Sequence, residues 1–191
     1  MLRMSEGYAI ELYFDPALEN QVLKSWNILS RRQITSHLIQ IQSRPHITLF
    51  SSNNPLLLEP STLQTLLSSF ASTIDPFPIT FSSISSFPSS NDNSFFLSPT
   101  PSFSLLNLQS QLSDSLKKEG IHVSSDFSLD SWIPFCSVAQ NLPKQRMAEA
   151  FSVLRDFKLP VTGYAMDIGV VEFSPLREVF SVVLGTNVEQ P

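Results

Sequence analysis

The sequence predicts a mixed α+β fold made of two similar halves, and three observations point to this class. First, a chain of 191 residues has the length of one domain with one core, so we expect residues 1–191 to fold together. Second, stretches with helical periodicity and stretches with strand periodicity are interleaved along the chain. Third, two segments 89 residues apart, 45–49 (PHITL) and 134–138 (PFCSV), share one pattern, and each is expected on a strand that follows a helix.

The first half is expected to contain two helices and several strands. Along the first strand, at 8–14, one face carries Tyr8, Ile10, Leu12 and Phe14, and the other carries Ala9, Glu11 and Tyr13. A helix then begins at Asp15 and Pro16 and ends near Arg32, because aspartate caps free backbone amides and proline fits the first helical position. The remaining predicted elements are a short strand at 38–41, a strand at 44–50, a helix at 61–73 and strands near 79–84 and 94–97.

The second half repeats this arrangement. Its predicted elements are a helix at 102–119 closed by Gly120, the second motif strand at 131–139, a helix at 144–157 and two final strands at 161–173 and 178–184. Two segments rich in serine and proline, 82–90 and 98–104, are expected to be loops. Because each motif strand must turn its aliphatic face toward helices, we expect the two other faces to meet across a concave sheet surface and form a cleft.

The composition excludes several classes of protein. A net charge of −5, with Arg31-Arg32 as the strongest basic cluster, argues against a protein that grips a long nucleic acid by charge, although a small cleft for one phosphate remains compatible. The single cysteine, Cys136, excludes a disulfide framework and suits a reducing compartment. No signal-peptide run and no stretch of about 18 apolar residues occurs. We therefore expect a cytoplasmic or nuclear protein without a membrane anchor.

The two motifs differ at one position that faces the expected cleft. On a strand, successive side chains point to opposite faces, so the second and fourth residues of each motif share a face. These pairs are His46 with Thr48 and Phe135 with Ser137, opposite Ile47 with Leu49 and Cys136 with Val138. The first motif therefore offers an imidazole and a hydroxyl, whereas the second offers a hydroxyl beside a phenyl ring.

These motifs resemble the two signatures of the two-histidine (2H) phosphoesterases, which include plant cyclic phosphodiesterases and bacterial RNA ligase-like proteins. Residues 44–49 (RPHITL) look like the first H-x-T signature. Residues 132–139 (WIPFCSVA) are similar to the second, in which tryptophan and proline often precede H-x-T/S, and 167–184 resemble the closing hairpin. The resemblance covers the chain from Tyr8 to Gly185. It implies a bilobal α+β fold, with two pseudo-symmetric lobes of antiparallel sheet, outer helices and a central cleft.

The resemblance also implies a reaction and its residues. In the family, two histidines flank a 2′,3′-cyclic phosphate: one takes a proton from water and the other protonates the departing ribose oxygen, with no metal or other cofactor. His46, Thr48 and Ser137 match the catalytic positions, but Phe135 stands where the second histidine belongs. A phenyl ring transfers no proton, and loss of one positioned acid or base costs about 10²- to 10⁴-fold in rate.

Three further residues are candidates for ligand binding. Arg44 shares a face with His46 and is expected either to contact phosphate or to remain solvated. Phe135 is expected either to close an abandoned site or to form a platform on which a base stacks. Tyr13, like Glu11, is expected to face the cleft from the first strand or to lie on the lobe surface, and Glu11 would repel a phosphate. His37 and His122 are expected on loops or near strand ends, away from the cleft.

Three functions follow as hypotheses. The first is a catalytically impaired 2H homologue that binds a nucleotide 2′- or 3′-phosphate, a 2′,3′-cyclic phosphate or a short RNA end. The second is a scaffold for a protein partner, with a vestigial cleft. The third is an active phosphodiesterase that uses a different base.

Overall fold

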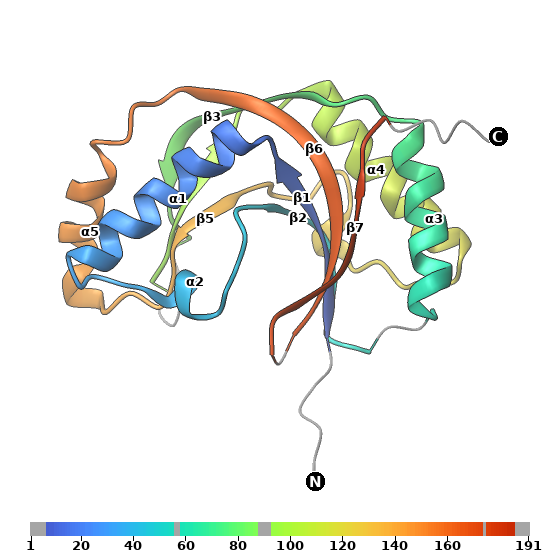
Figure 1. Cartoon of the computed structure of the whole chain (residues 1–191), viewed down its shortest axis with the longest axis horizontal. Coiled ribbons are helices and arrows are strands. Elements are labelled where there is room, and N and C mark those ends of the chain that lie inside the picture. The colour runs from blue at the N-terminus through green and yellow to red at the C-terminus, as the bar shows by residue number, and fades with distance from the viewer. Residues whose placement is uncertain (1–6, 56–57, 88–92, 174, 186–191) are drawn as a thin grey trace, which may run out of the picture.

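The computed structural model describes residues 7–55, 58–87, 93–173 and 175–185 and shows a strongly curved antiparallel sheet with helices outside it. Helices α1 and α5 lie at one end of the molecule, and α3 and α4 lie at the other (Figure 1). The predicted α+β class is confirmed. None of the helices in the described part of the chain has the length and hydrophobicity that crossing a membrane requires.

Strands and helices alternate along the chain. In chain order they are β1 Tyr8–Phe14, α1 Pro16–Arg31, α2 His37–Gln40, β2 Ile47–Ser52, α3 Pro60–Ser72, β3 Phe77–Ser85, β4 Phe95–Pro99, α4 Phe103–Lys118, the 3₁₀ turn η1 Ser125–Phe127, β5 Cys136–Ala139, the 3₁₀ turn η2 Lys144–Arg146, α5 Met147–Leu154, β6 Val161–Glu172 and β7 Arg177–Val183. The strand order is β2-β1-β6-β3-β4-β5, with β7 also paired to β6.

The long strand β6 joins two lobes into one sheet: the first lobe holds β1, β2 and β7, and the second lobe holds β3, β4 and β5. The lobes therefore differ from the two halves of the sequence, because β1 and β3 both come from the first half. Its first part pairs with β3, from Val161 opposite Phe81 to Ala165 opposite Phe77. Its second part pairs with β1, from Ala165 opposite Phe14 to Glu172 opposite Tyr8. In Figure 1 this strand arches across the molecule, so the two lobes share a continuous backbone hydrogen-bonded surface and their relative position is set by it.

The core follows the predicted alternation of the first strand and extends into both halves. Ile10 and Leu12 are fully buried, and they belong to a hydrophobic cluster that also contains Phe81, Leu105 and Cys136. The opposite face of β1 is buried as well, because every residue of this strand is covered. Polar side chains on that second face must therefore find partners within the protein, which matters for the site.

Several boundaries differ from the sequence prediction. The apolar run at 38–41 is not a strand but lies in the short helix α2, since so short a run carries no reliable periodicity. The helix expected at 144–157 is shorter, with a 3₁₀ turn before α5, and the second motif strand begins only at Cys136. The serine-rich segments are not all loop: β3 extends to Ser85 and β4 includes Ser98, whose hydroxyl bonds that of Ser85. Residues 88–90 of the first segment lie outside the described residues.

The start of α1 leads to a prediction about stability. The Asp15 carboxylate accepts hydrogen bonds from the amides of Ala17 and Leu18, at 2.9 and 3.0 Å, and its other oxygen accepts from the amide of Tyr164 on β6. Asp15→Ala is expected to lower the free energy of unfolding by about 1–2 kcal/mol, because it removes a helix cap and a contact between helix and sheet. Urea unfolding measures this loss. In Ser102→Ala, the control, only one capping bond is removed, and a loss equal to that of Asp15→Ala would contradict the role assigned to the β6 contact.

Candidate functional site

The two motifs begin just before β2 and β5 and continue into these strands, with the predicted alternation of faces. Ile47 and Leu49 are fully buried in the core, whereas His46 and Thr48 are only partly covered. In the second motif Cys136 and Val138 are buried, and Phe135 and Ser137 are partly covered. Each motif therefore presents its second and fourth side chains on the side away from the core.

Direct contacts hold the two motifs together. The indole N–H of Trp132 donates to the backbone carbonyl of Thr48 at 3.1 Å, so the segment before β5 is bonded to β2. The backbone of His46 lies near the thiol of Cys136 and acts to lower its pKa, but burial has the larger effect. Burial raises the pKa of this thiol to about 12, so Cys136 is a neutral packing group. The segment that precedes the second motif strand thus contacts the first motif strand.

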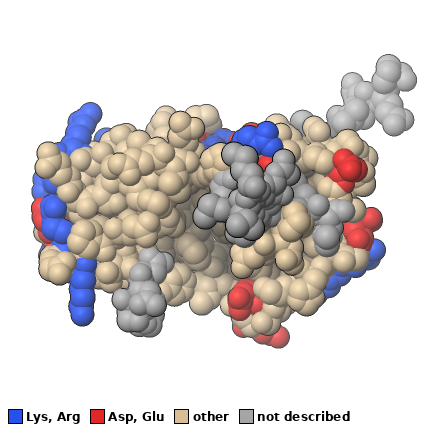
Figure 2. Space-filling view, turned by 90° about the horizontal axis from the view of Figure 1, so that it is seen from below, with Lys and Arg blue, Asp and Glu red and all other residues tan. Residues whose placement is uncertain are grey.

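A pocket of about 490 Å³ opens beside the first motif. Its wall includes His46, Thr48 and Glu11 from the sheet, residues of the α2 segment, Gln140 after β5 and residues of the β6–β7 turn; the full lining is Ala9, Glu11, Leu38, Ile41, Ser43, His46, Thr48, Ser51, Gln140, Phe173, Pro175 and Leu176. Seen from below in Figure 2, the surface is hollowed between the two ends of the molecule, and many of the residues visible beside the hollow are uncharged. The second motif reaches this pocket indirectly, because the Gln140 amide donates to the hydroxyl of Ser137 at 3.0 Å.

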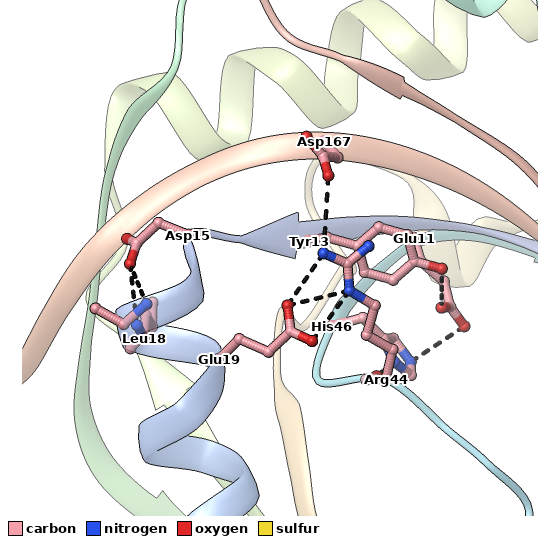
Figure 3. A network of polar contacts seen from close by, with 9 residues as sticks. Glu11, Tyr13, Asp15, Leu18, Glu19, Arg44, His46 and Asp167 are labelled. Atoms are coloured by element: carbon pink, nitrogen blue, oxygen red, sulfur yellow. Dashed lines mark hydrogen bonds and ion pairs between the residues drawn. The ribbon is translucent and has the colours of Figure 1, made fainter.

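The His46 ring is held by a contact at each nitrogen (Figure 3). Nδ1 lies 2.6 Å from the backbone carbonyl of Arg44. A carbonyl only accepts, so Nδ1 carries a proton and donates it. Nε2 lies 3.3 Å from Oε1 of Glu11, and the side chain is 21% exposed. The nitrogen that is available for chemistry therefore faces both the pocket and a carboxyl group.

Glu11 is the site residue whose role the sequence did not reveal. It is 4% exposed, and its Oε2 accepts a hydrogen bond from the Tyr13 hydroxyl at 2.9 Å. Burial raises the pKa of Glu11 above its ordinary value, while the neighbouring His46 and Tyr13 act in the opposite direction. The alternation of β1 was the one available signal, since it put Glu11 and Tyr13 on one face, expected either toward the cleft or on the lobe surface, but it could not show that Glu11 contacts His46.

Tyr13 and Arg44 support the site from behind and are not among the residues that line the pocket. Tyr13 is 1% exposed, and its ring lies against Gly169, where an added Cβ would come within 2.3 Å of it. The Arg44 guanidinium stacks on this ring at 4.1 Å. Arg44 also pairs with Glu19 through two nitrogens: Nε donates to both carboxylate oxygens, at 3.2 and 3.1 Å, and Nη2 lies 3.0 Å from Oε2. Nη2 lies 3.7 Å from Asp167 as well (Figure 3). The structure thus places Arg44 in an ion-pair network and Tyr13 beneath it, in positions that differ from the expected ligand contacts.

Phe135 packs into a cluster of three aromatic rings. Its centroid lies 5.0 Å from that of Phe96 and 5.4 Å from that of Phe87, and those two rings are 4.5 Å apart. Phe96 stands opposite Ser137 in the β4–β5 pair, just as Glu11 stands opposite Thr48 in the β1–β2 pair. The second lobe therefore has phenylalanines at both positions where the first lobe has the interacting His46 and Glu11.

The other histidines lie elsewhere. His122 lines a separate pocket of about 350 Å³ with residues of the β2 end, and His37 lies 3.2 Å from the amide nitrogen of Asn141. Neither residue contributes to the wall of the His46 pocket. In the described ranges, moreover, His, Cys, Asp and Glu do not gather in a group of three that could hold a metal ion.

The curved sheet, the outer helices and the paired motif strands define the class of 2H phosphoesterase folds. Escherichia coli LigT complexed with 3′-AMP has the same fold, with a TM-score of 0.59, 11% identity and coverage of 95% of this chain and 99% of LigT. TT0787 of Thermus thermophilus has a TM-score of 0.61, 10% identity and the same coverage. The model of the 2′-5′ RNA ligase superfamily matches residues 16–174, and the chain belongs to this superfamily. No curated protein matches it.

Proposed function

We propose that this protein is a catalytically impaired 2H phosphoesterase that binds the phosphate end of a nucleotide beside His46. The ligand is a 2′,3′-cyclic phosphate or a 2′- or 3′-monophosphate, either free or at the end of a short RNA. One observation carries the proposal: the first motif lines an open pocket, while Phe135 of the second motif packs against Phe87 and Phe96.

The pocket offers suitable hydrogen-bond donors for a phosphate group. Hydroxyl groups of Thr48 and Ser43, the amide of Gln140 and Nε2 of His46 all belong to residues of its wall. Its volume lies within the range of about 300–1,000 Å³ that is common for small-molecule sites. LigT, which shares the fold, has been crystallised with 3′-AMP, ATP and NADP+, and this supports a nucleotide as the ligand class. Phe135 is only partly buried, so its cluster offers a face on which a base can stack.

The impairment follows from the missing second imidazole. In-line hydrolysis needs one group to activate water and another to protonate the leaving oxygen, and histidine serves both roles near neutral pH. Phe135 supplies neither, and its ring is engaged with two other aromatic rings. The chain therefore retains half of the proton-transfer apparatus together with hydroxyl groups that can hold phosphate.

The scaffold hypothesis receives less support from this geometry. A vestigial cleft would be filled by apolar side chains, and the Phe135 side of the groove does have this character. The His46 side, however, is an open pocket with several polar groups in its wall. An open pocket that carries several polar groups favours a small ligand over a purely structural role.

A test of this proposal measures binding with and without the His46 imidazole. Isothermal titration calorimetry with 2′,3′-cyclic AMP, 2′-AMP and 3′-AMP is expected to detect binding, and His46→Ala is expected to weaken it by about 10- to 100-fold, the loss of one hydrogen bond to a charged group. His122→Ala, which removes a histidine from the separate pocket, serves as the control and is expected to bind as the wild type does. Absence of heat with all three nucleotides at millimolar concentration would refute the proposed function.

A further inference from the structure

The contact between His46 and Glu11 requires at least one shared proton. Nδ1 of His46 already uses its proton for the Arg44 carbonyl at 2.6 Å. Nε2 and Oε1 of Glu11 are 3.3 Å apart, and two unprotonated acceptors would repel each other at this distance. The pair is therefore either an imidazolium with a carboxylate or an imidazole with a carboxylic acid. In both forms its net charge is zero.

A second proton has a defined place on Glu11. The Tyr13 hydroxyl donates to Oε2 at 2.9 Å, so Oε2 is occupied as an acceptor and Oε1 is the oxygen that faces His46. Glu11 is 4% exposed, and burial disfavours its charged form; accordingly its pKa is raised. Tyr13 is itself fixed between Arg44 and Gly169, and its own pKa is raised by burial and by Glu11, so it remains a donor over the ordinary pH range.

The charges around Glu11 do not prepare the pocket for an anion. The ionisable groups that act on it come from three places in the sheet: Tyr13 on β1, Arg44 and His46 before β2, and Glu178 on β7. Of these groups, Arg44 is the one that stays positively charged at all ordinary pH values. Its charge is already balanced, because it is paired with Glu19 and lies near Asp167 on β6. A phosphate group that binds to Nε2 of His46 would therefore be repelled by the negative charge of the Glu11 carboxylate beside this nitrogen. Protonation of Glu11 removes that repulsion.

We propose that the pocket binds a phosphate group together with one proton, which Oε1 of Glu11 takes up as the ligand arrives. This inference rests on the proposed phosphate-binding function and adds a specificity-determining residue to it. In the bound state the imidazolium N–H and the carboxylic acid O–H both donate to phosphate oxygens. The first lobe thereby supplies two hydrogen-bond donors and one net positive charge without any contribution from position 135. Affinity for the phosphate then falls as pH rises, because the required proton becomes scarcer.

Calorimetry in two buffers tests this directly. The ligand is 2′,3′-cyclic AMP, since a cyclic diester lacks the second ionisation near pH 6 that a phosphate monoester has. Titrations at pH 6.0 in MES and in Bis-Tris, which have different ionisation enthalpies, give the number of protons taken up per ligand bound. The wild type is expected to take up close to one proton. In Glu11→Gln the carboxyl group that takes up the proton is gone, so uptake is expected to fall well below half a proton.

Two further results separate the possible outcomes. Glu11→Gln is expected to bind at least tenfold more tightly than the wild type at pH 6.0, because the competing negative charge has been removed. Glu178→Gln removes a carboxylate that acts on Glu11 from β7 but leaves the Glu11 carboxyl in place, so it is expected to keep the proton uptake of the wild type. Binding with equal proton uptake in the wild type and Glu11→Gln overturns this inference and leaves the proposed function intact. Absence of binding in both proteins overturns both.

Discussion

Phe135→His is expected to raise the rate of 2′,3′-cyclic AMP hydrolysis by about 10²- to 10⁴-fold, the usual contribution of one positioned acid or base. Residue 135 stands just before β5, two residues from Ser137, as His46 stands just before β2, two residues from Thr48. The indole of Trp132 bonds β2 and holds the two segments side by side. An imidazole at this position would therefore provide a second proton-transfer group across the groove from the first.

Two control variants show whether the gain comes from proton transfer. Chromatography of the 2′-AMP and 3′-AMP products measures the rate. Phe135→Gln has a polar side chain of similar size that exchanges no proton near neutrality, and it is expected to stay at the wild-type rate. Adding His46→Ala to Phe135→His is expected to remove the gain, because both imidazoles are needed. Equal rates for the histidine and glutamine variants would contradict the assignment of position 135.

Trp132→Ala is expected to lower the free energy of unfolding by about 3–5 kcal/mol, a large part of the stability of a typical domain. The indole is 8% exposed and belongs to the core cluster. Trp132→Phe keeps most of the buried surface but removes the hydrogen bond to the Thr48 carbonyl, and it is expected to cost about 1–3 kcal/mol through the unpaired acceptor. Urea unfolding of both variants measures the two contributions separately.

The neighbouring Ile133 provides the matched control for Trp132. Its side chain is 56% exposed, so Ile133→Ala is expected to change the stability by less than about 0.5 kcal/mol. Trp132→Phe is also expected to weaken nucleotide binding more than Ile133→Ala does, because Thr48 loses its backbone anchor. A Trp132→Phe protein as stable as the wild type would show that the bond between the motif strands contributes little.

Elements with strong local signals could be predicted from the sequence. Asp15 and Pro16 mark the start of α1, and Gly120, with a φ of +76°, follows α4 as the expected cap. Ser102 caps the beginning of that same helix. Such signals act between residues a few positions apart, so they are visible in the sequence alone. The four-residue helix α2 has no side-chain cap, and its apolar run was therefore misassigned as a strand.

In the candidate site, too, local features could be predicted from the sequence, whereas contacts between distant segments could not. The shared face of His46 and Thr48 follows from strand alternation, and so does the burial of Ile47 and Leu49 on the other face. The contacts of these residues with other segments do not follow. Glu11 comes from a different strand, and its hydrogen-bonding partners depend on the register of β1 against β2, where a bulge follows Ile10. One shift of register would have turned Glu11 to the other face.

The amino-acid order by itself determined the two motif strands, the faces of their side chains and the loss of the second histidine at Phe135, because these properties depend on residue type and on a two-residue repeat. Only the tertiary structure determined that Glu11 meets His46, that Arg44 is paired with Glu19 and that Phe135 joins two other rings. The reason is that sheet register and the path of β6 bring together atoms that lie far apart in the chain. The protonation of Nε2 of His46 depends on one such neighbour, the carboxyl group of Glu11.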